Sequence, residues 1–102
     1  MTRKRQKLPP LHPGEHLKTV LKDVGLSANA LALALRIPAN RLTEIINGKR
    51  SLSADTALRL GRYFGTSAQM WVNLQAKFDL DVATDHLADR IQEEIQPMRK
   101  AS

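Results

Sequence analysis

The sequence predicts an all-α protein in which a domain of five helices is followed by a C-terminal amphipathic helix. Apolar residues recur three or four positions apart in successive segments, and no useful length of chain alternates with the period of two typical of strands. Serine, glycine and proline residues separate these segments where helices are expected to begin and end. With 102 residues, 42% of them hydrophobic, the chain is long enough for one domain with a single core.

The chain opens with a basic, proline-rich segment, which we expect to form an arm over residues 1–13. Pro9, Pro10 and Pro13 disfavour a helix there. The first helix is predicted over residues 14–24 and is expected to stop at Gly25. One face of this helix is apolar and carries Leu17, Val20, Leu21 and Val24.

The most informative stretch is residues 27–50, where two short helices are predicted only a few residues apart. Ser27 is a natural N-cap for a nearly apolar helix over residues 28–35. A second helix starts near Pro38, which suits a first turn, and ends where Gly48 supplies a left-handed cap. The side chains expected to pack the two helices together are Leu31, Ala32, Leu35, Leu42 and Ile45. The pattern indicates a helix-turn-helix, in which the second helix enters the major groove of DNA.

Three further helices are predicted in the rest of the chain. Ser53 caps a fourth helix that runs through about Phe64, and Ser67 caps a fifth. A sixth is expected over residues 81–96, before Pro97. The apolar stripe of the sixth consists of Ala83, Leu87, Ile91 and Ile95. The predicted organisation is therefore an arm (1–13), a helix-turn-helix DNA-binding domain (14–80), an acidic C-terminal helix (81–97) and a tail (98–102).

The distribution of charge supports contact with a polyanion. The net charge is +6, and cations cluster in the arm and between residues 36 and 62. Residues 79–94 reverse the sign, with six acidic residues against the single cation Arg90. Either cluster could also be a simple solvated face. The absence of cysteine fits a reducing cytoplasm, and no apolar run is long enough to suggest a membrane span.

Four segments, in order, resemble the HigA/VapI branch of the Xre-type antitoxins, which carry a lambda-repressor-like helix-turn-helix. They are HPGE at 12–15, NRLTEIINGKRS at 40–51, ADTALRLGRYFGTS at 54–67 and MWVNLQAKFDL at 70–80. The resemblance implies a lambda-repressor-like five-helix domain that binds operator DNA as a homodimer and represses its own operon. It also implies a partner, a HigB-type toxin that is a small ribonuclease.

The resemblance places the recognition helix at residues 39–46 and implies a set of DNA-binding positions. Asn40 could hold an adenine edge or a phosphate, and Arg41 could fork onto guanine or a phosphate. The alternatives are that Asn40 is a helix cap and that Arg41 is a solvated surface residue. The full set of expected DNA-binding residues is Arg36, Pro38, Ala39, Asn40, Arg41, Thr43, Glu44, Lys49 and Arg50. Arg36 stands where the turn often has glycine, so we expect a positive φ there at a cost of roughly 1 kcal/mol.

The fifth helix is the expected dimer interface. Its candidate residues are Met70, Trp71, Leu74 and Phe78, although Trp71 could instead be buried in the core of one chain. The acidic helix over 81–97 could bind the toxin, the dimer mate or the core of its own chain.

No enzyme, cofactor or metal site is expected. His12 and His16 are four residues apart, but Pro13 and Gly14 interrupt the helix that would make this spacing useful for a metal. No glycine-rich phosphate loop or nucleophile motif is present. Two other functions stay open: a protein-only adaptor, and a free-standing Xre-type transcriptional repressor without a toxin.

Overall fold

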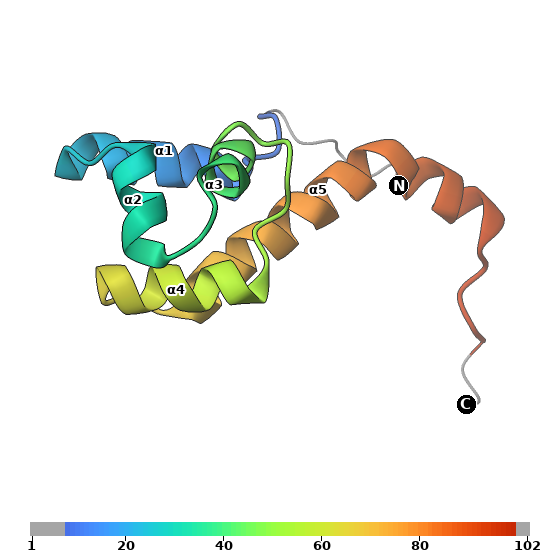
Figure 1. The fold of residues 1–102 in the computed structure, drawn as a ribbon. Helices are drawn as coiled ribbons and strands as arrows, with labels where there is room; N and C mark the ends of the chain where they lie inside the picture. Colours follow the sequence, from blue (N-terminus) through green and yellow to red (C-terminus); the bar gives the residue numbers. More distant parts are fainter. Residues whose placement is uncertain (1–7, 100–102) are drawn as a thin grey trace.

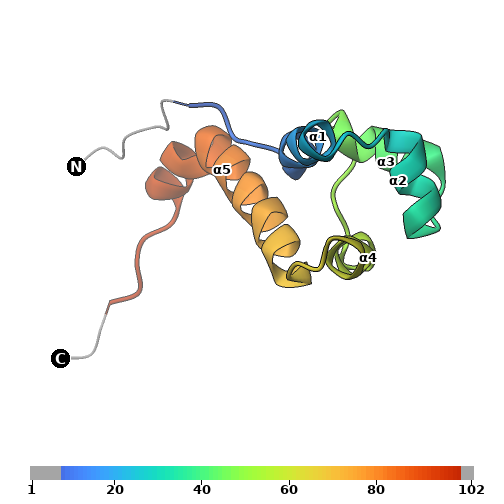
Figure 2. The same cartoon turned by 90° about the vertical axis from the view of Figure 1, so that its left-hand side faces the viewer.

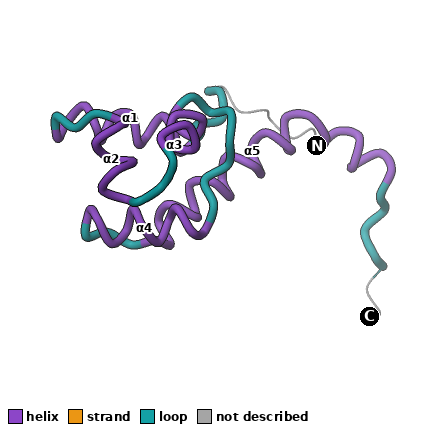
Figure 3. Tube along the Cα trace, viewed as in Figure 1, coloured by secondary structure: helices purple, strands orange, loops and turns teal. Residues whose placement is uncertain are grey.

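A computed structural model of the chain describes residues 8–99 and contains five α-helices (Figure 1). They are α1 (Pro13–Val24), α2 (Ala28–Leu35), α3 (Ala39–Ile46), α4 (Ala54–Phe64) and α5 (Ala68–Glu94). No strand occurs in the described part of the chain, as Figure 3 shows. The predicted all-α helix-turn-helix fold is confirmed. The basic arm and the tail lie largely outside the described residues.

The helix ends follow the local signals in the sequence. The hydroxyls of Ser27, Ser53 and Ser67 each accept a hydrogen bond from the backbone N–H three residues ahead, as N-caps do. Gly25 ends α1 and Gly65 ends α4, both in the left-handed conformation. These predicted boundaries are therefore confirmed.

The N-terminus of α1 is built differently from the other three capped ends. The helix starts at Pro13, one residue earlier than expected, and its cap is His12, whose Nδ1 accepts from the N–H of Gly14 at 2.9 Å. The backbone of α1 also comes unusually close to the end of α3. A Cβ placed on Gly14 would overlap the carbonyl oxygen of Ile45 and lie 2.8 Å from that of Ile46. Only glycine permits this crossing.

The predicted break between a fifth and a sixth helix is wrong, because α5 is continuous from Ala68 to Glu94. No glycine or proline lies in this span, and two side-chain pairs lie near the expected boundary, of which the second crosses it. Gln75 donates to Asp79 at 2.9 Å, and the ammonium of Lys77 lies 2.7 Å from a carboxylate oxygen of Asp81. Helix α5 ends three residues before Pro97, which disfavours helix at the residue before it.

The core lies between α1, α2, α3, α4 and the first half of α5. Its buried apolar residues are Leu17, Leu21, Leu31, Ala32, Leu35, Ile37, Leu42, Ile45, Leu52, Ala57, Leu60 and Trp71. Helix α3 packs on α1 and α2, while α4 packs on α5 and α2. The two views in Figures 1 and 2 show the second half of α5 projecting away from this body. Helix α3 thus lies within the packed body, and the C-terminal half of α5 extends away from it (Figure 1).

The apolar stripe of α5 changes side along its length. In the first half, Trp71 and Gln75 face the core and are buried. In the second half, Leu80, Leu87 and Ile91 are exposed. At 3.6 residues per turn, the exposed stripe lies about half a turn round the helix from the buried one. Within the described residues, no helix combines the length and the apolar character needed to cross a membrane.

Candidate nucleic-acid interface

The turn between α2 and α3 has the backbone conformation expected from the sequence. Arg36 has φ 60° and ψ 44°, and among the described residues it is the one non-glycine with positive φ. Its N–H donates to the carbonyl of Leu33 at 3.2 Å, and Ile37 donates to Ala32 at 3.1 Å. These two bonds close α2, so the chain can reverse and start α3 at Ala39.

Helix α3 presents the predicted faces. Leu42 and Ile45 are buried against the core, while Asn40 and Thr43 are exposed on the opposite side. Pro38 and Ala39, at the start of the helix, are exposed as well. At the start of α3, two apolar residues and one amide are therefore exposed to solvent. The two buried side chains hold the helix against the core.

Arg41 is a partner of α4 rather than a solvated side chain. Its Nη2 donates to a carboxylate oxygen of Asp55 at 2.7 Å and to the hydroxyl of Thr56 at 3.0 Å. Both contacts use one of the three guanidinium nitrogens, and a quarter of the side chain is exposed. Arg41 thus connects the first turn of α3 to the first turn of α4.

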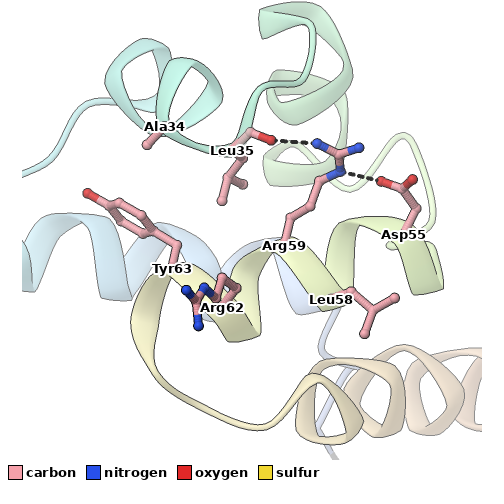
Figure 4. A pocket seen from close by; sticks show the side chains of 7 residues that line it. All are labelled: Ala34, Leu35, Asp55, Leu58, Arg59, Arg62 and Tyr63. Carbon is pink, nitrogen blue, oxygen red and sulfur yellow. Dashed lines mark hydrogen bonds and ion pairs between the residues drawn. The ribbon is translucent and has the colours of Figure 1, made fainter.

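Asp55 joins this contact to a second arginine. The Nε of Arg59 donates to the same carboxylate oxygen at 2.7 Å, and its Nη1 donates to the carbonyl of Leu35 at 2.8 Å (Figure 4). The hydrogen bond from Arg59, and after it that from Arg41, hold the pKa of Asp55 below its usual value of 3.8. One carboxylate therefore connects α3 and α4 to the C-terminal end of α2.

The Asp55–Arg59 network was missed in the sequence. Its local part could have been found, because Asp55 and Arg59 are four residues apart on one helix. The bonds to Arg41 and Leu35 join residues that are distant in the chain, and no local pattern indicates them.

Two more of the expected DNA-contacting residues pair with each other. The Nε of Arg50 donates to the carboxylate of Glu44 at 2.8 Å, across the end of α3. The hydroxyl of Thr43 donates to the carbonyl of Ala39 at 3.0 Å. Lys49 is exposed beside this pair. A small pocket of about 200 Å³ lies between α3 and the start of α4, lined by Arg41, Ile45, Arg50, Ser51, Ser53 and Thr56.

The expected dimer residues of α5 lie against their own chain. Trp71 is 2% exposed and belongs to the core, which is the alternative that the sequence left open. Met70 and Leu74 are partly buried on the same core, and the ring of Phe78 makes an edge contact with His12 at 4.9 Å. Trp71 therefore cannot reach a second copy while the chain keeps this packing.

Gln75 has a structural role that sequence reasoning missed. It is buried on α5, and its Oε1 accepts from the N–H of Leu52 at 2.7 Å. Leu52 lies in the loop between α3 and α4, so this bond fixes the loop that carries Lys49 and Arg50. The sequence did hold one signal of this role, because Gln75 is a polar residue within the apolar stripe of α5.

The two histidines engage separate partners. The ring of His12 caps α1, whereas the ring of His16 packs on Trp71 with 5.3 Å between centroids. Over residues 8–99, no group of three or more potential ligands could hold a metal ion.

Comparisons with known proteins agree on one family. The helix-turn-helix family (HTH_3) matches residues 17–71. Virulence-associated protein I of Dichelobacter nodosus is 50% identical over 80 residues, covering 78% of this chain and 74% of that protein. A HigA-family addiction module antidote protein from Coxiella burnetii has a TM-score of 0.87 and 46% identity, covering 89% of this chain and 100% of that one. The Pseudomonas aeruginosa antitoxin HigA, solved with the higBA promoter, has a TM-score of 0.85 and 44% identity, covering 88% and 99%.

The carboxylate of Asp55 should make the free energy of unfolding depend on pH in the acid range. Because folding lowers the pKa of Asp55, its stabilisation is complete well above pH 3.8 and is lost as the pH falls below that value. Asp55→Asn should therefore lower stability at neutral pH and flatten the loss between about pH 5 and pH 3. Urea unfolding at several pH values measures both effects. Asp23→Asn, which removes an exposed carboxylate near the end of α1 and outside this network, is the matched control. A parallel pH profile for Asp55→Asn would contradict this role.

Proposed function

This chain belongs to the HigA/VapI branch of the Xre-type helix-turn-helix family, and we propose that it is an antitoxin that represses its own operon and neutralises a toxin ribonuclease. The observation that carries the proposal is the likeness, over most of both chains, to an antitoxin solved with its promoter. A net charge of +6 and an exposed recognition-helix face are consistent with this role. We place the protein in the cytoplasm, where its DNA would be.

The proposed DNA contact is centred on α3, which enters the major groove by its N-terminal residues. Pro38, Ala39, Asn40 and Thr43 face the base edges. Asn40 is the residue suited to hydrogen-bond a base, since an amide matches the N6 and N7 of adenine. Within residues 8–99, no hydrogen bond of the structure engages its side chain.

The proposed phosphate contacts flank the recognition helix. Arg36 lies at the turn before α3, and Lys49 and Arg50 lie just after it. Cations at both ends of the helix suit the two strands that border a major groove. In this proposal Arg41 and Glu44 act mainly as positioning residues, because their charged groups bind Asp55 and Arg50.

A homodimer is proposed because each chain carries one recognition helix, and two helices double the bases read. The recognition helices should then lie about 34 Å apart, or a multiple of it, on a palindromic site. With Trp71 buried, the surface offered to a second copy is the exposed stripe on the second half of α5. A groove of about 300 Å³ runs along it, lined by Leu80, Ala83, Thr84, Ala88, Ile91 and Gln92.

Substitutions on α3 and after it should separate base reading from phosphate binding. Asn40→Ala should cost about 1–3 kcal/mol on the preferred sequence and little on random DNA. Lys49→Ala should weaken binding to the preferred sequence and to random DNA equally. It should also lower the slope of log affinity against log salt concentration by about one unit. Fluorescence anisotropy at several salt concentrations measures these effects. Arg90→Ala, on the distal half of α5, is a control of equal charge change. Equal losses on both duplexes for Asn40→Ala would make Asn40 a phosphate contact.

Charges placed on the exposed stripe of α5 should separate the dimer. Leu87→Lys combined with Ile91→Lys leaves the core intact, because both side chains are exposed in the single chain. Sedimentation should show a folded monomer that binds the palindromic site more weakly. Leu58→Lys, at an exposed leucine of α4, should leave the dimer unchanged. A double variant that sediments as a dimer would exclude this face as the interface.

The antitoxin and the free-standing repressor differ in one partner. An antitoxin should have a neighbouring reading frame that encodes a short, basic ribonuclease-like protein, and the acidic stretch of residues 79–94 has the sign that attracts such a protein. Co-expression should relieve the growth arrest that this neighbour causes. The Lys49→Ala variant should still relieve it, since that side chain serves DNA. Failure to rescue growth would favour a repressor without a toxin.

A further inference from the structure

The polar side chains of α3 are largely engaged within the protein. Arg41 binds Asp55 and Thr56, Glu44 binds Arg50, and the hydroxyl proton of Thr43 goes to the carbonyl of Ala39. The side chains at the start of α3, which would enter the groove first, therefore offer mostly apolar atoms to DNA. These atoms belong to Pro38 and Ala39, and the amide of Asn40 lies beside them. Hydrogen bonds alone would give this helix little sequence information.

An apolar pocket adjoins these residues. It has a volume of about 360 Å³, lies between α2 and the start of α3, and is lined by Asn29, Ala32, Leu33, Ile37 and Ala39. We call it the α2–α3 pocket. Four of its five lining residues are apolar, and Leu33 is 77% exposed. Leu33 therefore adds apolar surface beside the proposed DNA-binding helix, on a face otherwise expected to be polar or basic.

The major groove offers one apolar group, the 5-methyl of thymine. Apolar side chains discriminate thymine by contact with this methyl, whereas the other exposed groups of the base edges are hydrogen-bond donors and acceptors. The α2–α3 pocket is continuous with Ala39, the first residue of the recognition helix. A protein partner seated there would compete with DNA at the same helix, so DNA is the occupant that this position favours.

We propose that the α2–α3 pocket receives the 5-methyl group of a thymine in each half-site of the operator. This inference rests on the proposed DNA-binding function and adds a specificity element to it. Ala39 and Leu33 form the walls that contact the methyl group, and Asn40, one residue along, is placed to hydrogen-bond an adjacent adenine. The part of the half-site that faces the start of α3 should then consist of A·T pairs. The position of the thymine methyl group tells the protein which strand carries the thymine.

Removing single methyl groups from the DNA tests the proposal directly. The probe is the tightest-binding duplex selected from a random-sequence pool by the full-length wild-type protein. Each thymine is replaced in turn by deoxyuridine, which differs from thymidine only by the methyl group. One position per half-site should lose about fourfold in affinity, and the symmetric pair about fifteenfold, since one buried methyl contributes about 0.8 kcal/mol. Replacement by 5-bromodeoxyuridine, whose bromine has the size of the methyl group, should restore binding.

Matched protein variants tie the effect to the pocket. Leu33→Gln should reduce the preference for thymidine over deoxyuridine at that position to below twofold, and its exposure means that folding is unaffected. Leu58→Gln, at a leucine of α4 that is 65% exposed, should keep the full preference. Ala39→Ser should behave like Leu33→Gln, because a hydroxyl replaces part of the apolar wall.

The outcomes separate this inference from the function on which it rests. Sequence-selective binding with equal affinity for thymidine and deoxyuridine at every position would overturn the methyl readout and leave DNA recognition intact. A methyl effect that survives Leu33→Gln and Ala39→Ser would also overturn it, by moving the contact elsewhere. Failure of the pool to yield any preferred duplex would instead overturn sequence-specific DNA binding itself.

Discussion

The placement of the recognition helix depends on one close crossing of backbones. Gly14, in the first turn of α1, lies against the carbonyl groups of Ile45 and Ile46 at the end of α3, where no side chain fits. The crossing sets the distance between the two helices, and the buried side chains of Leu42 and Ile45 then fix how α3 is rotated. His12 caps α1 by accepting the N–H of Gly14 itself, so the cap and the crossing share one residue and define a single corner of the fold.

The ion pairs around α3 determine geometry more than stability. Exposed pairs such as Glu44–Arg50 contribute roughly 0–1 kcal/mol, whereas buried leucines contribute several times more. What the pairs do provide is a fixed orientation of α2 and α3 relative to α4. Asp55 holds Arg41 from one side and Arg59 from the other, and Arg59 in turn reaches the last carbonyl of α2. The two helices of the motif are thereby tied to α4, and the exposed side chains at the start of α3 that lie outside these bonds are those of Pro38, Ala39 and Asn40.

The sequence was informative wherever a structural feature has a local cause. Ser27, Ser53 and Ser67 cap helices through bonds to residues three positions away, and the positive φ of Arg36 follows from its place in a short turn. Features that join distant segments were not predictable in this way. Gln75 reaches the loop before α4, and Arg41 reaches α4, through contacts that only the folded chain creates. The division of α5 into two helices failed for a related reason, since its apolar stripe changes side near Leu80 while the backbone stays helical.

The change of side on α5 explains how one helix can serve two surfaces. Its first half is buried through Trp71 and is also bonded to the loop after α3 through Gln75. Its second half turns its apolar residues outward, where the second copy of the proposed dimer would pack. A rigid helix shared by the core and by a dimer interface would relate the two recognition helices through a continuous backbone rather than through a flexible linker. In such an assembly the spacing of the half-sites would be set by the packing of α5 against α4, because that contact determines the angle at which each domain leaves the dimer axis.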